Sequence, residues 1–427
     1  MASKIKIKVK ALAERAAVAS KLRRLAIARK SFRLRQVAGR RLGRPARSCG
    51  VNLVAYIRAE MGLGQAARGM AAALEAARIP FGIVNFERGN LSAQTNLAWR
   101  HREVERPDYD VTLVCVNPDN GDNLRATVSN SLLGNRYVIG NWFWELPELP
   151  DEWVKEFALL DEVWAGSRFI QDAVALKSPV PVVRIPPVVE AARGESLPRG
   201  FFGLPERRFL FLCVCDTMSV LERKNPLGAV RAFKRAFGAD DARVGLVVKF
   251  NNTGFASAEL EQVREEVRSL ANIYTLERVL SREEMAGLLD ASDCVVSLHR
   301  SEGFGLVPAE AMLLGKPVML TDWSGNTDYM TPDNSIGIGY ELVSLGRDYG
   351  PYKAHQFWAE PDLEQAAHWM RRLVSGATAE GLGPRTPAPH TGGRRRRPRA
   401  QVRDALPRPR AVEGDGAEGT GLGDGDV

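Results

Sequence analysis

The stretch SEGFGLVPAE (residues 301–310) stands between a short apolar run and an apolar pattern with helical spacing. A strand, a glycine-containing loop and a helix in this order predict one repeat of a parallel α/β sheet. Gly303 and Gly305 leave backbone N–H groups accessible at the start of the helix, where an anion is stabilised. The carboxylates of Glu302 and Glu310, eight positions apart, can each accept hydrogen bonds from hydroxyl groups of a ligand.

The same alternation of β-branched runs and helical patterns extends outward from this stretch. Strands such as FLFLCV (209–214) are apolar on both faces, as in a parallel sheet that helices cover on both sides. The expected strands are Val51–Ile57, Phe81–Phe86, Val111–Val116, Tyr137–Gly140, Glu162–Ala165, Val182–Ile185, Phe209–Val214, Val244–Phe250, Ile273–Leu276, Cys294–Leu298 and Pro317–Thr321. We therefore predict an α/β fold with two doubly wound, Rossmann-like domains, residues 49–195 and 206–374, that face a central cleft.

The charge of the chain is unevenly distributed. Its 427 residues contain 59 Lys and Arg against 51 Asp and Glu, a net charge of +8. Residues 1–48 hold sixteen of these cations and one acid, Glu14, so the arm carries +15 and the rest 8 − 15 = −7. The body is therefore not expected to bind nucleic acid. The basic amphipathic arm predicts contact with an anionic membrane surface, each cation contributing about 1 kcal/mol, with a solvated extension as the alternative.

Residues 375–427 have a different composition from the rest. Gly376 to Val427 contains eleven glycines and six prolines among 52 residues, and no aromatic residue. Such a segment cannot bury enough apolar surface to offset its ordering entropy, so we expect a disordered tail. The amphipathic helical pattern of Trp358–Val374 stops abruptly before it. We hypothesise that the tail is read from a shifted frame, which an intact frame on resequencing the locus would disprove.

The cysteine content and the hydropathy of the chain indicate the cellular compartment in which the protein is expected. The five cysteines are too scattered for a disulfide framework and are expected to be reduced core thiols: Cys49, Cys115, Cys213, Cys215 and Cys294. No run of about 18 apolar residues exists, so no membrane-spanning helix is expected. A cytoplasmic protein is predicted, with the arm resting on the inner face of the plasma membrane.

A second polar motif, LERKNP (221–226), also follows a predicted strand. Asn225 can cap the helix that Pro226 opens. Arg223 and Lys224 then lie beside a helix N-terminus, a favourable place for a diphosphate. A solvated basic turn is the alternative.

Two motifs of the first half have the same position after a strand. Gly62 and Gly64, at the start of a helical pattern, allow a phosphate-bearing ligand to approach the backbone, with a plain tight turn as the alternative. In NWFWELP (141–147), Trp144 and Glu145 are suited to the apolar face and the hydroxyls of a sugar. The alternative is aromatic packing between the domains.

Together these motifs resemble a bacterial branch of the retaining GT-B glycosyltransferases called group 1, or family 4. Glu302 and Glu310 match the E-x7-E pattern of that family. The other matching motifs are GLG (62–64), WELP (144–147), DEVW (161–164), ERKNP (222–226), and SGN (324–326) with Asp328. The resemblance covers about residues 50–374. It implies transfer of a sugar, with retention of configuration, from a nucleotide-diphosphate sugar to a saccharide or lipid-linked acceptor. The donor is a substrate, and no cofactor is implied.

The resemblance also implies roles for individual side chains. Arg223 and Lys224 neutralise the donor diphosphate, although many members place the arginine six positions before the lysine, where this chain has Met218. Glu302 contacts the transferred sugar, and Glu310 binds the nucleotide ribose. The other residues implied on the donor side are Gly62, Gly64, Gly303, Phe304, Gly305 and Leu306. Those implied on the acceptor or sugar side are Trp144, Glu145 and Asn326, where many members carry a histidine at the place of Trp144-Glu145.

No metal is expected in this reaction. Fixed cations and a helix dipole at the leaving phosphate stabilise the charge that develops when the sugar–phosphate bond breaks. The string Asp108-Tyr109-Asp110 precedes its strand, so we place it in a loop at the edge opposite the cleft. His299, next to the Glu302 loop, is interpreted as structural.

Two alternatives remain. A nicotinamide-dependent oxidoreductase would explain the strand–glycine–helix opening and Glu87 at the end of the second strand, but it gives Arg223 and Lys224 no role. The other alternative is a truncated, inactive relic, because the family's last helix usually crosses back onto the first domain and the tail after Ser375 would replace it. The expected product of an active enzyme is a cell-surface polysaccharide or glycolipid.

Overall fold

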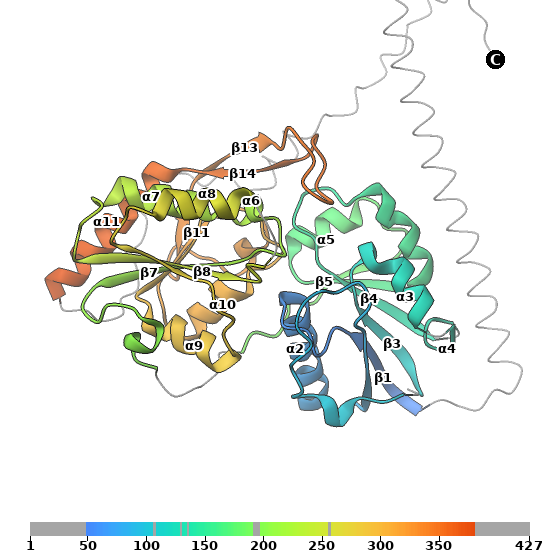
Figure 1. The fold of residues 1–427 in the computed structure, drawn as a ribbon. Coiled ribbons are helices and arrows are strands. Elements are labelled where there is room, and N and C mark those ends of the chain that lie inside the picture. Colours follow the sequence, from blue (N-terminus) through green and yellow to red (C-terminus); the bar gives the residue numbers. More distant parts are fainter. Residues whose placement is uncertain are drawn as a thin grey trace, which may run out of the picture. The chain divides into compact units, whose positions relative to one another are not determined.

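The computed structural model describes residues 48–105, 108–128, 130–134, 136–190, 197–254 and 258–380. The predicted arm lies outside the described residues except for Ser48, and the predicted tail does so except for residues 375–380. The described elements form two parallel sheets, each of which carries helices on both faces (Figure 1).

The first domain alternates strands and helices from Ser48 to Arg184. Its elements are β1 (Ser48–Ala55), α2 (Gly62–Ala76), β2 (Phe81–Asn85), η1 (Arg100–Arg102), β3 (Tyr109–Cys115), η2 (Pro118–Asn120), α3 (Gly121–Thr127), α4 (Asn130–Leu133), β4 (Tyr137–Trp142), η3 (Asp151–Leu159), β5 (Glu162–Ala165), α5 (Arg168–Ala175) and β6 (Val182–Arg184).

The first sheet has the strand order β2-β1-β3-β4-β5-β6, and each pair of neighbours is parallel. Helix α2 packs on one face through Ala67 and Met70. Helix α5 packs on the other face through Ile170 and Val174. The strand order reverses between β1 and β3, and in doubly wound folds ligands bind at the carboxyl ends of strands beside such a switch point.

The second domain repeats the scheme and ends in a hairpin and a long helix. Its elements are η4 (Arg199–Phe202), β7 (Phe209–Asp216), α6 (Leu221–Lys224), α7 (Pro226–Ala236), β8 (Val244–Asn251), α8 (Ala258–Val267), β9 (Ile273–Leu276), α9 (Arg282–Ala291), β10 (Cys294–Ser297), α10 (Leu306–Leu313), β11 (Val318–Thr321), η5 (Gly325–Asp328), β12 (Ile336–Ile338), β13 (Tyr340–Ser344), β14 (Phe357–Pro361) and α11 (Leu363–Glu380).

The second sheet has the order β12-β11-β10-β7-β8-β9, again with parallel neighbours. The alternation of side chains along β7 explains why both of its faces are apolar. Phe211 and Cys213 pack with α7, α8 and α11, whereas Leu210 and Leu212 pack with α9 and α10. The predicted fold of two doubly wound domains is therefore confirmed. The switch point of this sheet lies between β7 and β10.

The helix predicted from Trp358 is the main difference from the sequence analysis. Phe357–Pro361 instead forms strand β14, which pairs antiparallel with β13. Helix α11 starts only at Leu363, because Pro361 disfavours helical geometry in the residue before it and the Asp362 side chain accepts the N–H groups of residues 364 and 365. The helix continues through Glu380, so residues 375–380 of the predicted tail are helical. It packs on the second domain, and a helix crossing back onto the first domain is not among the described residues.

Two expectations about the whole chain can be compared with the described residues. All five cysteines are free, and four of them are buried, but Cys49 at the start of β1 is exposed, so the core-thiol prediction is wrong for that residue. Among the helices of the described ranges, none is both long enough and apolar enough to cross a membrane.

The segment around the β13–β14 hairpin packs against the first domain. Leu345, Tyr352 and Trp358 belong to the same buried cluster as Trp144 of the first domain. The Tyr352 ring lies 5.2 Å from that of Trp144, and its hydroxyl donates to Oε2 of Glu145 at 2.8 Å. The two domains are thus held together by apolar burial as well as by polar contacts.

Replacing the buried ring of Tyr352 should therefore destabilise the protein. We expect Tyr352→Ala to lower the free energy of unfolding by about 3–5 kcal/mol, the usual loss for a large buried aromatic side chain. The matched control is Tyr137→Ala on β4, where the side chain is 40% exposed and the loss should stay below about 1 kcal/mol. Urea unfolding followed by circular dichroism measures both. Equal losses would contradict the packing role of Tyr352.

Candidate active site

Two of the predicted motifs meet at the switch point of the second sheet. Strands β7 and β10 are hydrogen-bonded neighbours, with Cys294 opposite Phe211. The loop after β7 leads into α6 with Arg223 and Lys224, and the loop after β10 carries Glu302. Because parallel strands end at the same edge of a sheet, residues 78 positions apart come together here.

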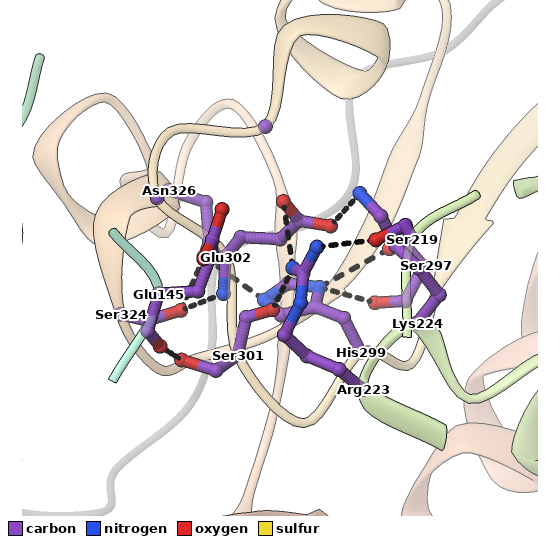
Figure 2. Close-up of polar contacts among 12 residues, drawn as sticks. Glu145, Ser219, Arg223, Lys224, Ser297, His299, Ser301, Glu302, Ser324 and Asn326 are labelled. Atoms are coloured by element: carbon purple, nitrogen blue, oxygen red, sulfur yellow. Dashed lines mark hydrogen bonds and ion pairs between the residues drawn. The ribbon is translucent and has the colours of Figure 1, made fainter. Parts of the chain in front are cut away.

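Glu302 forms a buried ion cluster with both basic residues of α6 (Figure 2). Its Oε1 accepts a hydrogen bond from Nζ of Lys224, and its Oε2 lies 3.4 Å from Nη1 of Arg223. The carboxylate side chain is 10% exposed. Burial alone would raise the pKa of Glu302, but Lys224 and Arg223 outweigh it and lower the pKa to about 2. Glu302 is therefore ionised at neutral pH.

The two basic neighbours have different surroundings. The side chain of Arg223 is 5% exposed, whereas that of Lys224 is 23% exposed. Nη1 of Arg223 donates to the carbonyl of Ser301 at 2.7 Å, and Nη2 donates to Oγ of Ser219 at 2.8 Å. The Arg223 guanidinium also lies 6.0 Å from the centre of the Tyr352 ring. In this arrangement Arg223 supports the Glu302 loop, and Lys224 is the more accessible of the two cations. The direct contact of Arg223 with a diphosphate stays a prediction.

The loop after β11 fixes the backbone on both sides of Glu302. Oγ of Ser324 accepts the N–H of Glu302 at 2.8 Å, and the N–H of Gly325 donates to the carbonyl of Glu302 at 2.8 Å. Ser324 adopts a φ of 74°, a conformation that is uncommon for a residue with a side chain. A Cβ atom on Gly325 would lie 1.8 Å from the carbonyl oxygen of Gly303, so only glycine fits there.

Asn326 has a structural role in the same loop. Its side chain is fully buried, its Nδ2 donates to the carbonyl of Thr321 at 2.8 Å, and its Oδ1 lies 3.0 Å from Nε2 of His299. Burial lowers the pKa of His299, so its ring is neutral at pH 7. The structure agrees with the structural interpretation of His299, and it corrects the placement of Asn326 on the sugar side, because no part of that side chain is exposed.

The first domain contacts the Glu302 loop directly. Oγ of Ser167 donates to the carbonyl of Gly303 at 2.7 Å, and a Cβ atom on Gly303 would lie 3.1 Å from the carbonyl of Trp144. Oγ of Ser301 donates to the carbonyl of Glu145. A Cβ atom on Gly303 would also lie 3.8 Å from Cγ of Glu145. Glu145 therefore contacts the loop that carries Glu302, and its role toward an acceptor or sugar stays a prediction.

Trp144 does not reach the site with its ring. The side chain is 1% exposed, packs edge-on against Trp153 at 4.9 Å, and donates from Nε1 to the carbonyl of Glu148. The predicted sugar contact of Trp144 is corrected in favour of the packing alternative. The aromatic motif after β4 builds the core beneath Glu145.

Glu310 lies on α10 and contacts the first domain instead of Glu302. Its Oε1 accepts a hydrogen bond from Nε2 of Gln65 on α2. Burial raises the pKa of Glu310 to about 7, although the Gln65 hydrogen bond counteracts this effect. Within the described residues, the two acids of the E-x7-E pattern do not contact each other through a hydrogen bond. Glu310 is bonded to Gln65, whereas Glu302 pairs with Lys224 and Arg223.

The two glycine loops provide backbone donors. Gly305 has a φ of 88° just before α10, and a Cβ atom there would lie 2.7 Å from the Tyr329 hydroxyl. The N–H groups of residues 303–306 donate to no group in the described part of the chain. In the first domain, a Cβ atom on Gly64 would lie 2.2 Å from the carbonyl of Ala59, whereas Gly62 faces open space. Gly64 is therefore required by the turn, and Gly62 is free to border a ligand.

Several residues of this arrangement have no role in the sequence analysis. Ser301 and Ser324 lie inside the recognised motifs, which therefore predict that both are near the site. The hydrogen bonds that these two serines form could not be predicted from the motifs. Tyr352 is distant in the sequence and stands in no motif. Arg68 holds the first-domain turn, because its Nη1 donates to the carbonyls of Ile57 and Ala59 at 3.1 and 2.9 Å.

The candidate metal motif lies away from this site. Oδ1 of Asp110 accepts the N–H of Gly50 at 3.2 Å near the amino end of β3, the opposite edge from the loops above. Tyr109 and Asp110 belong to β3 itself, so of the three residues predicted to lie in a loop only Asp108 does. A search of the described ranges finds no group of three or more His, Cys, Asp or Glu side chains arranged to hold a metal ion.

Comparison with known families agrees with the geometry. The model of the family described as Family 4 Glycosyltransferase in conflict systems matches residues 167–360, which include Lys224, Glu302 and Glu310. Residues 167–360 thus match a family 4 glycosyltransferase, and the two domains have the GT-B fold. This assignment confirms the family resemblance and removes the oxidoreductase alternative. No protein with a curated description matches the sequence.

Solved glycosyltransferase structures share the fold at low sequence identity. Sucrose-phosphate synthase from Thermosynechococcus elongatus aligns with a TM-score of 0.53 and 14% identity over 78% of this chain and 91% of its own. A glycosyltransferase from Rickettsia africae aligns with a TM-score of 0.53 and 13% sequence identity, over 79% of this chain and 90% of its own. HepE from Anabaena was solved with UDP and glucose. It aligns with a TM-score of 0.50 and 13% sequence identity, over 78% of this chain and 90% of its own. Against the longer TarM from S. aureus the chain covers 48% of the length, at a TM-score of 0.44 and 11% identity.

The buried ion cluster makes a prediction about stability. Glu302→Gln leaves Arg223 buried without its carboxylate and should lower the free energy of unfolding by about 3 kcal/mol. Because the pKa of Glu302 is lower in the folded than in the unfolded chain, this stabilisation is complete above about pH 4.5 and is lost as the pH falls toward 2. The difference in stability between wild type and variant should therefore shrink from pH 6 to pH 3.5 in urea unfolding.

The control for this experiment is Glu341→Gln on β13, where the residue is exposed. That variant should stay within about 0.5 kcal/mol of wild type at both pH values. A Glu302→Gln difference that is the same at pH 6 and pH 3.5 would show that the ion cluster does not hold Glu302 ionised.

Proposed function

We propose that this glycosyltransferase transfers a sugar from a nucleotide-diphosphate sugar with retention of configuration and without a divalent metal. The observation that carries the proposal is the pair of Lys224 and Glu302 at the switch point of the second sheet, next to the N-terminus of α10. A cation, a carboxylate and free backbone donors within one loop cluster are suited to a diphosphate that carries a sugar.

The leaving diphosphate would take Lys224 as its side-chain cation. Lys224 pairs with Glu302. A bound diphosphate offers a stronger negative charge, so Lys224 would turn to it and Glu302 would accept hydrogen bonds from hydroxyls of the transferred sugar. The N–H groups of residues 303–306, including Phe304 and Leu306, would donate to the sugar and phosphate, where the α10 dipole adds partial positive charge.

Glu310 and Glu145 would complete the two sides of the reaction. Glu310 would accept the ribose hydroxyls, and Gly62 would border the diphosphate from the first domain. Glu145, held by the Tyr352 hydroxyl, would contact the acceptor or the transferred sugar. Retention would follow from attack on the side of the leaving group, with the departing phosphate as the base for the acceptor hydroxyl.

The solved structure of HepE with UDP and glucose supports UDP-sugars as the first donors to test. The acceptor would be a saccharide or a lipid-linked saccharide, with a cell-surface polysaccharide or glycolipid as the product. The experiment is a screen of the purified chain with UDP-, GDP-, ADP- and dTDP-sugars, with release of the nucleoside diphosphate as the signal. Failure of every donor, with a folded protein, would support an inactive relic.

Lys224→Ala should lower turnover on the active donor by ~10²-fold or more, as when a preorganised transition-state charge contact is lost. The matched control is Lys234→Ala on α7, whose side chain is 43% exposed and forms a surface ion pair with Glu266. The control should keep wild-type turnover. Steady-state release of nucleoside diphosphate measures both, and near-normal turnover of Lys224→Ala would exclude this site.

Chelation tests whether the reaction needs a metal. Because Lys224 and backbone dipoles are proposed to stabilise the leaving diphosphate, turnover should be the same after dialysis against EDTA and after addition of Mg²⁺ or Mn²⁺. A loss of turnover of about tenfold or more on chelation that Mg²⁺ or Mn²⁺ restores would show that a divalent cation takes part in the leaving-group chemistry.

A further inference from the structure

One hydrogen bond between the domains involves a residue without a role in the proposed function. Gln65 lies in the first turn of α2, and its Nε2 donates to Oε1 of Glu310 on α10. Both side chains are half-buried. In the proposed function Glu310 binds the ribose of the donor nucleotide. The first domain would therefore contact the ribose-binding carboxylate directly, through Gln65. One oxygen of this carboxylate faces Gln65, and the other is left for ribose hydroxyls.

The position of Gln65 is fixed by its surroundings in the first domain. The residue before it, Gly64, approaches the carbonyl of Ala59 so closely that a side chain would not fit. One turn further along α2, Arg68 donates to the carbonyls of Ile57 and Ala59. The turn before α2 is therefore held from two sides, and Gln65 is presented to α10 from a rigid support.

The other charged groups around Glu310 are few. Arg282, at the start of α9, is the cation that acts on it, and Arg282 is itself paired with Glu190 at 3.2 Å. Arg68 on α2 lies close enough to Arg282 to be repelled by it. Within the described residues, Gln65 supplies the only side-chain hydrogen bond to Glu310. Loss of this donor would leave a partly buried carboxylate without a hydrogen-bond partner, which favours its protonated form.

We propose that Gln65 is a positioning residue of the nucleotide site: its amide holds the Glu310 carboxylate in the orientation that accepts ribose hydroxyls, so donor affinity depends on the contact between α2 and α10. This inference rests on the proposed role of Glu310. It extends that role, because the nucleotide site is then complete only when the first domain is in contact with the second.

The test uses nucleotides with and without ribose hydroxyls. Binding of UDP and of 2′,3′-dideoxy-UDP is measured by calorimetry. If the wild-type chain binds GDP or ADP more tightly than UDP, that nucleotide and its 2′,3′-dideoxy analogue are used instead. Wild type should prefer the ribonucleotide. Gln65→Met should weaken it on the order of tenfold, the loss of one hydrogen bond to a charged group, and leave the dideoxy analogue unchanged. Glu310→Gln should remove the preference between the two.

The pH dependence provides a readout that a purely structural defect would not change. The pKa of Glu310 is raised to about 7, so its carboxylate forms, and the preference for the ribonucleotide over the dideoxy analogue rises, as the pH increases through that value. This preference is the quantity followed, because the terminal phosphate that both nucleotides share also ionises, with a pKa of about 6. Gln65→Met should move the midpoint to higher pH, and Glu310→Gln should abolish the dependence. The matched control is Gln171→Met on α5, whose amide donates to the carbonyl of Val182 within the first domain, and its midpoint should equal that of wild type.

The outcomes separate this inference from the proposed function. If Glu310→Gln keeps the preference for the ribonucleotide, the ribose role of Glu310 fails. If Glu310→Gln loses it but Gln65→Met keeps both the wild-type preference and the wild-type midpoint, only the role of Gln65 is overturned. Should Gln65→Met fold poorly, Gln65→Glu keeps the side-chain length and replaces the donor by an acceptor, and it should shift the midpoint further in the same direction.

Discussion

The buried carboxylate of Glu302 is the constraint on which the rest of the site depends. A carboxylate removed from water remains ionised only if cations and hydrogen bonds replace the solvent. Lys224 and Arg223 supply the positive charge from an element 78 positions away in the sequence. The strand order of the second sheet makes this contact available, because β7 and β10 are neighbours although β8 and β9 lie between them in the chain. The charge of Glu302 and the topology of the sheet are therefore parts of one arrangement.

The first domain is tied to this arrangement through backbone groups as much as through side chains. Ser167 donates to the carbonyl of Gly303, and Ser301 donates to the carbonyl of Glu145. Contacts of this kind need close approach, which explains the absence of a side chain at position 303. The loop that carries Glu302 is consequently fixed by both domains. A change in the contact between the domains would alter the position of the carboxylate, which couples the packing of the fold to the chemistry.

The sequence predicted the elements whose pattern is local and missed those that depend on distant partners. Eleven of the twelve strands in the two described sheets follow from the local pattern, since residues such as Phe211 and Leu212 make a strand apolar on both faces. The exception is the three-residue strand β12 (Ile336–Ile338), which the sequence analysis does not predict. Strand β14 was read as helix, because Trp358 and its neighbours also fit helical spacing and the deciding partner, β13, lies on another segment. For the same reason Trp144 was ambiguous: its packing depends on Tyr352, more than 200 positions away. The motifs thus predicted which loops come together at the switch point of the second sheet, but not which side chains of each motif are buried.

Arg223 and Lys224 are adjacent and carry the same charge, but their side chains have different surroundings and different partners. Successive residues of a helical turn point in directions about 100° apart, so the two side chains approach the Glu302 carboxylate from different directions, Arg223 from the buried side and Lys224 from the more accessible side. The guanidinium, with several donors in a plane, is the group that can satisfy Ser219, the Ser301 carbonyl and Glu302 at once. The ammonium of Lys224, on its flexible stem, is left at the accessible end of the carboxylate. Since Met218 stands where many family members have their second cation, this chain would present one side-chain charge to a diphosphate. In the proposed function, the backbone donors of residues 303–306 would then supply the rest of the charge stabilisation at the diphosphate.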